Sequence, residues 1–436
     1  MGRLLADIRP LRESPPFRRL WIGSTLSAVG GALTMFAVPL QVYDITRSSF
    51  AVGAIGVAQM IPTVTIAPPS SPIVTVDRRK LVLAASSASA VVSAGLAAQA
   101  FAGLRSVWLL YVLVAVASSC GAINAPVRRT FIPSLLPADQ LTAGLALNRL
   151  TMQIMLTAGP GLAGLITAAP GLGLRACYLI DAASFACSLY GVARLPALPR
   201  STAAARPGPR AVAAGIRYIG RSHVLVGAFL ADLNATIFGL PVALFPAINA
   251  ERFGADPRTL GLFTTAIGVG GLISGALSGP VGHITRQGRA MLCAVAIWGA
   301  AFAGFAVAST LWLTLLMLAI AGAADTFTVI FRGAMVQQVT PAEFRGRVTA
   351  ADYVVAVSGG QLGNLEAGTL GSLTSPTISA LTGGLITVAA AVAIGLALPA
   401  FTRYRPQPRT EPQPHPQPHA SPSERRVRHE TLVSLR

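Results

Sequence analysis

Four carboxylates lie within long apolar runs of the sequence instead of in the polar stretches between them. They are Asp181, Asp232, Asp325 and Glu366; a fifth acid, Asp352, lies near the end of its run and is interpreted as a residue at the membrane interface. A charge inside a bilayer costs at least about 2.5–3.5 kcal/mol, so acids at such positions are functional candidates by default. An apolar cavity disfavours the charged form of a carboxylate and lets it exchange protons near neutral pH. Asp325 and Glu366 are the first candidates for proton exchange. Pairing with an arginine or a neighbouring helix is the alternative for all four, and it is favoured for Asp181 and Asp232, near helix ends.

Polar side chains in the apolar runs of the first half could line a path through the membrane. The candidates are Gln59, Asn124, Arg149 and Gln153. An amide side chain can hydrogen-bond a polar ligand or, equally well, a neighbouring helix, so both roles stay open.

The apolar runs that carry these residues define the class of protein. Of the 436 residues, 53% are hydrophobic and 11% are charged, and the mean hydropathy is +0.62. This is more apolar surface than a soluble core can bury, and it indicates membrane-spanning helices. We expect twelve spans, at 20–43, 50–74, 81–102, 107–130, 142–168, 175–194, 224–248, 258–282, 290–309, 311–334, 348–370 and 376–399.

The longest internal polar stretch follows the sixth span, where two bundles would be joined. The expected segments are a cytoplasmic arm (1–19), a six-helix bundle (20–195), a cytoplasmic linker (196–222), a second six-helix bundle (223–400) and a disordered, Pro/Gln-rich cytoplasmic tail (401–436). The first sixteen residues contain no apolar run followed by a cleavage site, so we expect no signal peptide.

Basic residues are distributed unequally between the two sets of loops. The net charge is +18, and about 28 of the 34 basic residues fall in one alternate set of loops and tails, with five in the other. This asymmetry follows the positive-inside rule, which places both termini in the cytoplasm and argues against nucleic acid as a partner. No His/Cys spacing suits a metal, and no G-x-x-x-x-G-K-(S/T) loop binds a nucleotide, so we expect neither an enzyme nor an ATP-driven protein.

The chain repeats itself at a shift of 204 positions. The shift places Trp108 on Trp312, Arg128 on Arg332, Pro137-Ala138-Asp139 on Pro341-Ala342-Glu343, and Gly159 and Gly164 on Gly363 and Gly368. Two similar halves in the same orientation are typical of carriers built from parallel repeats. Asp325 and Glu366 fall opposite Gly121 and Leu162, so both acids belong to the second copy alone.

Charged residues also cluster near helix ends on the arginine-rich side. They are Asp77, Arg78, Arg79, Lys80, Arg128, His283, Arg286, Arg289, Arg332 and Glu343. The repeat-related Arg128 and Arg332 could cap helix C-termini or pair with Asp77 and Glu343 and so hold this side closed. Ordinary positive-inside topology is the alternative. A separate run of residues in the fifth span permits close helix packing and a kink: Gly159, Pro160, Gly161, Ala163 and Gly164.

These motifs resemble those of the major facilitator superfamily. Residues 77–80 are similar to the end of its first loop motif, 279–289 to the second-half counterpart, and 159–164 to the G-P-x-x-G-G motif of proton-coupled antiporters. Residues 126–140 and 338–347 resemble the subgroup that contains the enterobactin exporter and macrolide-efflux-like proteins. Four residues differ from those usual in these motifs: Ser70, Val74, Ala163 and His283. The differences affect the charged contacts that the loop motifs form in the superfamily more than they affect the fold.

The resemblance implies an all-α integral membrane protein with twelve transmembrane helices in two pseudo-symmetric six-helix bundles, the major facilitator fold. It further implies a bacterial inner-membrane secondary transporter that works by alternating access, without a cofactor, and as a monomer. Its partners would be the lipid bilayer and a small molecule. Proton-antiport efflux of a siderophore, a drug or another amphipathic molecule is the first expectation. The alternatives are an uptake or symport carrier for a small metabolite and a non-transporting scaffold or sensor.

Overall fold

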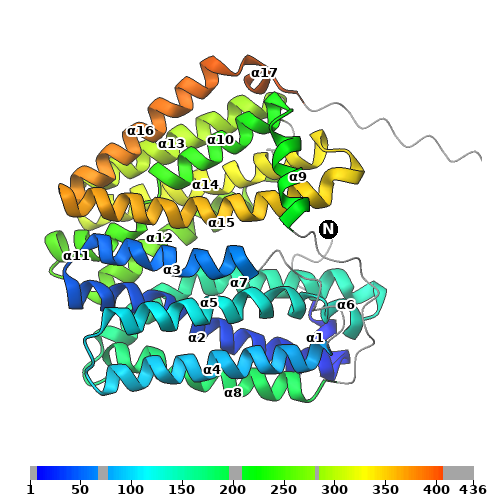
Figure 1. The fold of residues 1–436 in the computed structure, drawn as a ribbon, viewed down its shortest axis with the longest axis vertical. Helices are drawn as coiled ribbons and strands as arrows, with labels where there is room; N and C mark the ends of the chain where they lie inside the picture. The colour runs from blue at the N-terminus through cyan, green and yellow to red at the C-terminus, as the bar shows by residue number, and fades with distance from the viewer. Residues whose placement is uncertain (1–6, 67–76, 196–208, 280–283, 406–436) are drawn as a thin grey trace, which may run out of the picture.

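The chain is helical throughout the part that the structure describes. This computed structural model describes residues 7–66, 77–195, 209–279 and 284–405. Long helices lie side by side in two groups (Figure 1). Local sequence explains several helix starts, since Ser106, Ser222 and Ser375 each accept a hydrogen bond from the backbone N–H three residues later.

The first bundle contains six long helices: α2 (Pro15–Thr46), α3 (Ser49–Ile66), α4 (Arg78–Phe101), α5 (Val107–Arg129), α7 (Ala138–Ala168) and α8 (Gly173–Ala193). Helix α8 packs against α2 and α4, and α5 packs against α3 and α4. The short helices α1 (Arg9–Glu13) and α6 (Ile132–Leu135) precede α2 and follow α5.

The second bundle also contains six passes: α10 (His223–Phe238) with η2 (Val242–Leu244) and α11 (Phe245–Phe253), α12 (Pro257–Ala276), α13 (Gln287–Val307), α14 (Leu311–Val339), α15 (Ala342–Leu373) and α16 (Pro376–Ala397). The predicted seventh span, 224–248, is therefore interrupted at 239–241. Pro241, which has no N–H to donate, lies in this interruption. The short helices α9 (Pro209–Ile219) and α17 (Pro399–Thr402) flank this bundle in the sequence.

Eleven of the twelve predicted passes are helices that are long and apolar enough to cross a membrane. The twelfth, α15, is 32 residues long but less apolar, because it carries Asp352, Glu366 and several glycines. Large apolar side chains cover the outer surfaces, including the repeat-related Trp108 and Trp312, which are 79% and 67% exposed. Exposed apolar side chains of this size indicate a lipid-facing surface. The chain is a multi-span membrane protein.

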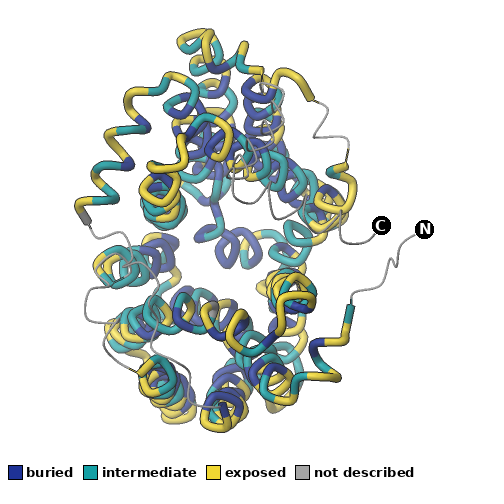
Figure 2. The backbone as a smooth tube through the Cα atoms, turned by 90° about the vertical axis from the view of Figure 1, so that its right-hand side faces the viewer, coloured by how far each residue is buried: buried dark blue, intermediate teal, exposed yellow. Residues whose placement is uncertain are grey.

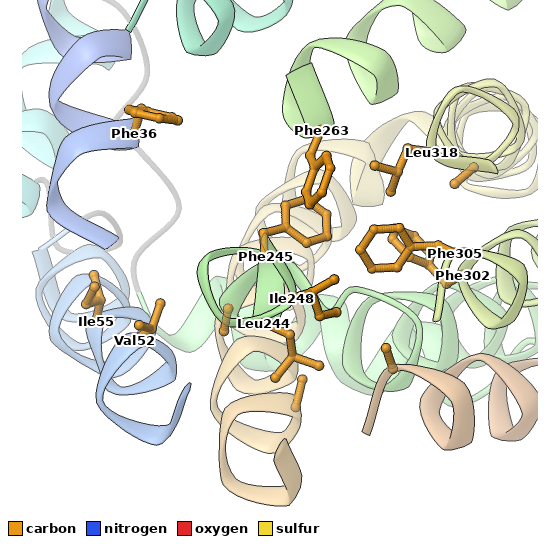
Figure 3. Packing of buried hydrophobic residues seen from close by; sticks show 14 of the residues in the cluster. Phe36, Val52, Ile55, Leu244, Phe245, Ile248, Phe263, Phe302, Phe305 and Leu318 are labelled. Atoms are coloured by element: carbon orange, nitrogen blue, oxygen red, sulfur yellow. The ribbon is translucent and has the colours of Figure 1, made fainter. Parts of the chain in front are cut away.

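Apolar contacts hold each bundle together internally. Buried residues face inward between the helices and exposed residues face outward (Figure 2). In the second bundle the aromatic residues gather at α11, where Phe245 packs against Phe263 and Phe305 at ring-centroid distances of 5.7 and 5.4 Å (Figure 3). Such edge-on aromatic contacts add to the stabilisation from burial.

The two bundles touch mainly through two helix pairs, α3 with α15 and α7 with α12, and through smaller contacts of α3 with η2 and of α2 with α11. Glycines allow the close approach: a Cβ at Gly368 would lie 2.5 Å from the Ser49 backbone oxygen, and one at Gly164 would lie 2.5 Å from the Pro257 oxygen. These contacts lie at the end of the molecule that carries the α2–α3 loop and α11, here called the loop end (Figure 1). The end that carries α1, α6 and α9 is here called the terminal end.

Candidate functional site

A cavity of about 600 Å³ lies within the first bundle. It extends from Phe17 and Ile132, near the terminal end, to Pro39 and Val114, well inside the bundle. Apolar residues and small hydroxyls make up most of its wall. The polar residues that line it are Ser24, Ser27, Thr34, Gln59, Ser89, Ser93, Ser118, Asn124, Arg128, Asn148 and Asp181. A mostly apolar cavity with a few polar groups is the usual form of a small-molecule site.

Asp181 on α8 is the acid of this cavity. Its Oδ2 accepts hydrogen bonds from Thr34 Oγ1 at 2.7 Å and from Ser93 Oγ at 2.8 Å, and its Oδ1 is buried without a partner. Helices α2 and α4 therefore hold the carboxylate from two sides. These hydrogen bonds are the pairing with neighbouring helices that the sequence favours for Asp181, and no arginine neutralises the carboxylate within the described residues.

Arg128, in the last turn of α5, is the cation of the cavity. Its guanidinium donates a hydrogen bond to Ser188 Oγ on α8, and its Nε is buried without a partner. The predicted pairing of Arg128 with Asp77 does not occur in the structure, because Asp77 lies at the start of α4 and accepts from the backbone N–H of Arg79 at 2.9 Å.

The buried arginine of the second bundle, unlike Arg128, is paired with carboxylates. Arg332 on α14 donates to Asp232 on α10 at 2.9 Å and to Asp352 on α15 at 2.8 Å. The side chains of Arg332 and Asp232 are 10% and 6% exposed, so this is a buried, doubly paired cation. The predicted pairing of Arg332 with Glu343 is wrong, and Asp352, which the sequence suggests is interfacial, is one of the two partners.

Asp325 and Glu366 are the acids within the predicted spans of the second bundle that remain unpaired. Within the described residues neither carboxylate makes a hydrogen bond or an ion pair. Asp325 precedes Arg332 by seven residues, which is two turns or roughly 10 Å along α14. Asp325 is therefore close to a charged network without being part of it.

A sequence profile of the transmembrane secretion effector family matches residues 6–426. The chain belongs to this family. The enterobactin exporter EntS of Shigella boydii serotype 18 (strain CDC 3083-94 / BS512) is 25% identical over 367 residues, which cover 82% of this chain and 86% of the exporter. EntS of Escherichia coli O1:K1 / APEC has the same identity and coverage.

Solved structures of similar fold include the nucleoside transporter NupG, with a TM-score of 0.70 and 16% identity over 90% of this chain and 100% of that one. A bacterial homologue of the human lysosomal transporter Spinster has a TM-score of 0.71 and 13% identity, with 92% and 99% covered. These similarities confirm the predicted major facilitator fold. This secretion effector is a membrane transporter of the major facilitator type.

The substrate-cavity residues predicted for this transporter divide into two groups. Gln59 lines the cavity and its Oε1 accepts a hydrogen bond from Gln361 of the other bundle at 3.1 Å; Asn124 lines it and donates to Ser86 Oγ at 3.0 Å. Arg149 is exposed and Gln153 is half-buried on α7, and neither lines the cavity. Sequence position alone does not fix which face of a helix a residue occupies.

The predicted gating residues near helix ends are mostly at the surface, and one of them caps a helix. Arg79 donates to the backbone oxygen of Ala193 at the end of α8, and so acts as a helix C-terminal cap. Arg78 is half-buried and Lys80 is exposed. Glu343, Arg286 and Arg289 are exposed, and His283 lies outside the described residues. Whether they control opening stays a prediction.

The predicted packing motif in α7 lies between helices. A Cβ at Gly159 would come within 2.5 Å of Ala32 Cβ on α2, and one at Gly161 would come within 2.9 Å of Thr265 Oγ1 on α12. Ala163 is fully buried. The oxygen of Pro160 lies 2.5 Å from the position of a Cβ at Gly261. The motif therefore serves both the first bundle and its contact with the second.

Asn148 is the cavity residue that the sequence argument missed, together with the hydroxyls of Thr34 and Ser93. A signal was present, because the 204-residue shift places Asn148 on Asp352 and Ala28 on Asp232. Both Ala28 and Asn148 line the cavity.

Proposed function

We propose that this transporter exports an amphipathic small molecule, of the siderophore or drug class, by proton antiport and alternating access. The observation that carries the proposal is the cavity of about 600 Å³ in the first bundle, in a molecule whose bundles meet at the loop end. Its volume suits a drug-sized molecule. The naming of the curated relatives as enterobactin exporters supports the direction of transport.

The orientation in the membrane follows from the arginines. Most of them lie in the arm, the loops and the tail at one side of the chain's spans, so the terminal end is cytoplasmic under the positive-inside rule. A molecule would then enter the cavity from the cytoplasm of a bacterial cell and cross the inner membrane. The unit that does this is a single chain, since one chain supplies both bundles.

The proton would be carried by an acid that has no fixed counter-ion. Asp325 meets this requirement best, because it lies in the middle of α14 and is unpaired, whereas Asp232 and Asp352 share Arg332. Glu366 and Asp181 are the further candidates. A cofactor has no part in this scheme.

Inverted membrane vesicles provide the test. Vesicles that contain the transporter should accumulate an added catecholate siderophore or macrolide when a proton gradient is imposed, and an uncoupler should abolish the accumulation. Vesicles without the transporter are the control. Uptake that is equal in both preparations, or that ignores the uncoupler, would contradict export by proton antiport, and accumulation only in right-side-out vesicles would indicate an uptake carrier.

A further inference from the structure

The two halves of the molecule each have an arginine at the same repeat position, and the two arginines differ in their partners. Arg128 and Arg332 occupy matching positions at a shift of 204 residues, one near the end of α5 and the other on α14. Arg332 is neutralised by two carboxylates, at 2.9 and 2.8 Å. The residues at the matching positions in the first half are Ala28 and Asn148, which carry no charge.

Arg128 consequently has a positive charge without a counter-ion. No carboxylate forms an ion pair with it among the described residues. The internal segments outside the described residues contain no Asp or Glu, and the remaining acids follow residue 405. The nearest acid of the wall is Asp181, which precedes Ser188, the residue that Arg128 contacts, by seven positions or roughly 10 Å of helix rise. Asp181 already accepts two hydrogen bonds from neighbouring helices.

Buried polar atoms without a partner line the cavity, and they include two donors and two acceptors, the acceptors being Asn124 Oδ1 and Asp181 Oδ1. Arg128 Nε is a buried donor without a partner, and so is Nε1 of Trp21; both side chains line the cavity. Ala28 and Asn148 line the same space, at the positions where the second bundle has its two carboxylates. A buried donor without an acceptor is costly, and a buried cation without a counter-ion is more so. Arg128 therefore offers a positive charge and a free N–H group to whatever enters the cavity, whose other charged residue is Asp181.

We propose that Arg128 binds the anionic group of the transported molecule, which takes the place that Asp232 and Asp352 occupy in the second bundle. The planar guanidinium suits a carboxylate or a similar oxyanion with two adjacent oxygens. The apolar part of the cavity, with Leu20, Met35 and Phe185, accommodates the body of the molecule. The substrate class is thus an amphipathic anion. This inference names the ligand of the proposed export function and rests on it.

Equilibrium binding tests the inference without any transport. The probe is 1-anilinonaphthalene-8-sulfonate, an amphipathic anion, and N-phenyl-1-naphthylamine is its uncharged counterpart. Their fluorescence is titrated against the full chain in nanodiscs of zwitterionic lipid. Arg128→Gln should weaken binding of the anion at least about tenfold and change binding of the neutral probe less than about twofold. Arg128→Lys should retain part of the affinity for the anion.

Two further variants sharpen the experiment. Ala28→Asp supplies the carboxylate that the second bundle has, so it should neutralise Arg128 and weaken anion binding as much as Arg128→Gln does. Arg149→Gln removes a positive charge on α7 outside the cavity and should leave both probes unaffected. Because Ala28→Asp and Arg128→Lys keep a charge at the site, they remain informative if Arg128→Gln fails to fold.

The inference is overturned if Arg128→Gln and Ala28→Asp bind the anion as tightly as the unaltered chain does, or if Arg149→Gln weakens binding equally. It is also overturned if the unaltered chain binds no more anion than empty nanodiscs do. The vesicle assay tests the export proposal separately. That proposal fails if the unaltered chain binds the anion but gives no gradient-driven accumulation in vesicles.

Discussion

Arg332 donates to carboxylates from two other helices, which makes this side chain part of the structure of the second bundle. Replacing it by methionine would leave the buried Asp232 and the half-buried Asp352 without a counter-ion. Removal of one partner of a buried ion pair costs about 3–5 kcal/mol, so Arg332→Met should lower the unfolding temperature by several degrees. Thermal unfolding in nanodiscs, followed by intrinsic fluorescence, measures the change.

Arg128→Met is the matched control for that experiment. It removes the same charge from the repeat-related position, but no carboxylate loses its counter-ion, so its effect on the unfolding temperature should be less than half as large. Equal destabilisation by the two variants would show that Arg128, too, serves mainly to hold the fold together.

Asp325 is unpaired in the middle of α14, which is what proton exchange requires of an acid. Asp325→Asn removes the titratable group with little change of volume. We expect it to lower gradient-driven accumulation in inverted vesicles at least about tenfold, while binding of the anionic probe changes less than about twofold. Asp44→Asn, which alters an exposed pair with Arg47, is the control.

Glu366→Gln, measured in the same way, distinguishes the two unpaired acids in the spans of the second bundle. A larger loss than in Asp325→Asn would assign proton exchange to α15 instead of α14. Full gradient-driven transport in both variants would place the proton site on another residue, with Asp181 of the cavity as the next candidate.

At the scale of the elements, the sequence predicts the passes well and their contacts poorly. Apolar runs and the 204-residue repeat are enough for twelve passes in two halves, because lipid demands a helix wherever a run crosses it. The place of Arg149 outside the cavity depends on helix orientation, which the apolar pattern does not give. The partners of Arg332 lie 100 and 20 residues away, so only tertiary packing reveals them.

Helices α3 and α15 meet without room for a side chain at several positions. A Cβ at Gly368 would lie 3.1 Å from the carbonyl carbon of Ser49 and 3.2 Å from the Cα of Gly53. Gly368→Leu should therefore force the two helices apart at the loop end. A cysteine at the buried position 49, in a chain whose four native cysteines are replaced, should then become reactive towards a membrane-impermeant maleimide.

Gly275→Leu is the control, because a Cβ at this position of α12 meets nothing within 4 Å. It should leave Ser49→Cys as protected as in the parent chain. Protection of Ser49→Cys that survives Gly368→Leu would mean that the bundles do not depend on this glycine for their contact at the loop end.

At the scale of the whole molecule, the two halves have the same arrangement of helices and different proposed functions. The first bundle contains the cavity and Arg128, which has no counter-ion among the described residues, whereas the second has the repeat-related Arg332 neutralised and two unpaired acids in its spans. Binding in one half and proton exchange in the other must then communicate through the contacts between the bundles. Gln59 and Gln361 form such a contact beside the cavity, at 3.1 Å.

Alternating access requires that contact to open, and a disulfide across it should prevent the opening. A Cβ at Gly56 would lie 3.4 Å from the Cα of Gln361, which is close to the geometry that a disulfide needs, and 2.8 Å from its backbone oxygen, so the two helices must move slightly apart to admit the cysteine. In the cysteine-free chain, oxidation of Gly56→Cys/Gln361→Cys should abolish accumulation in vesicles and leave binding of the anionic probe within about twofold, and a reductant should restore transport. Each single cysteine variant is the control for the oxidant. Undiminished transport by fully cross-linked protein would show that α3 and α15 stay together throughout the cycle, so that the cavity would have to reach the loop end by another route.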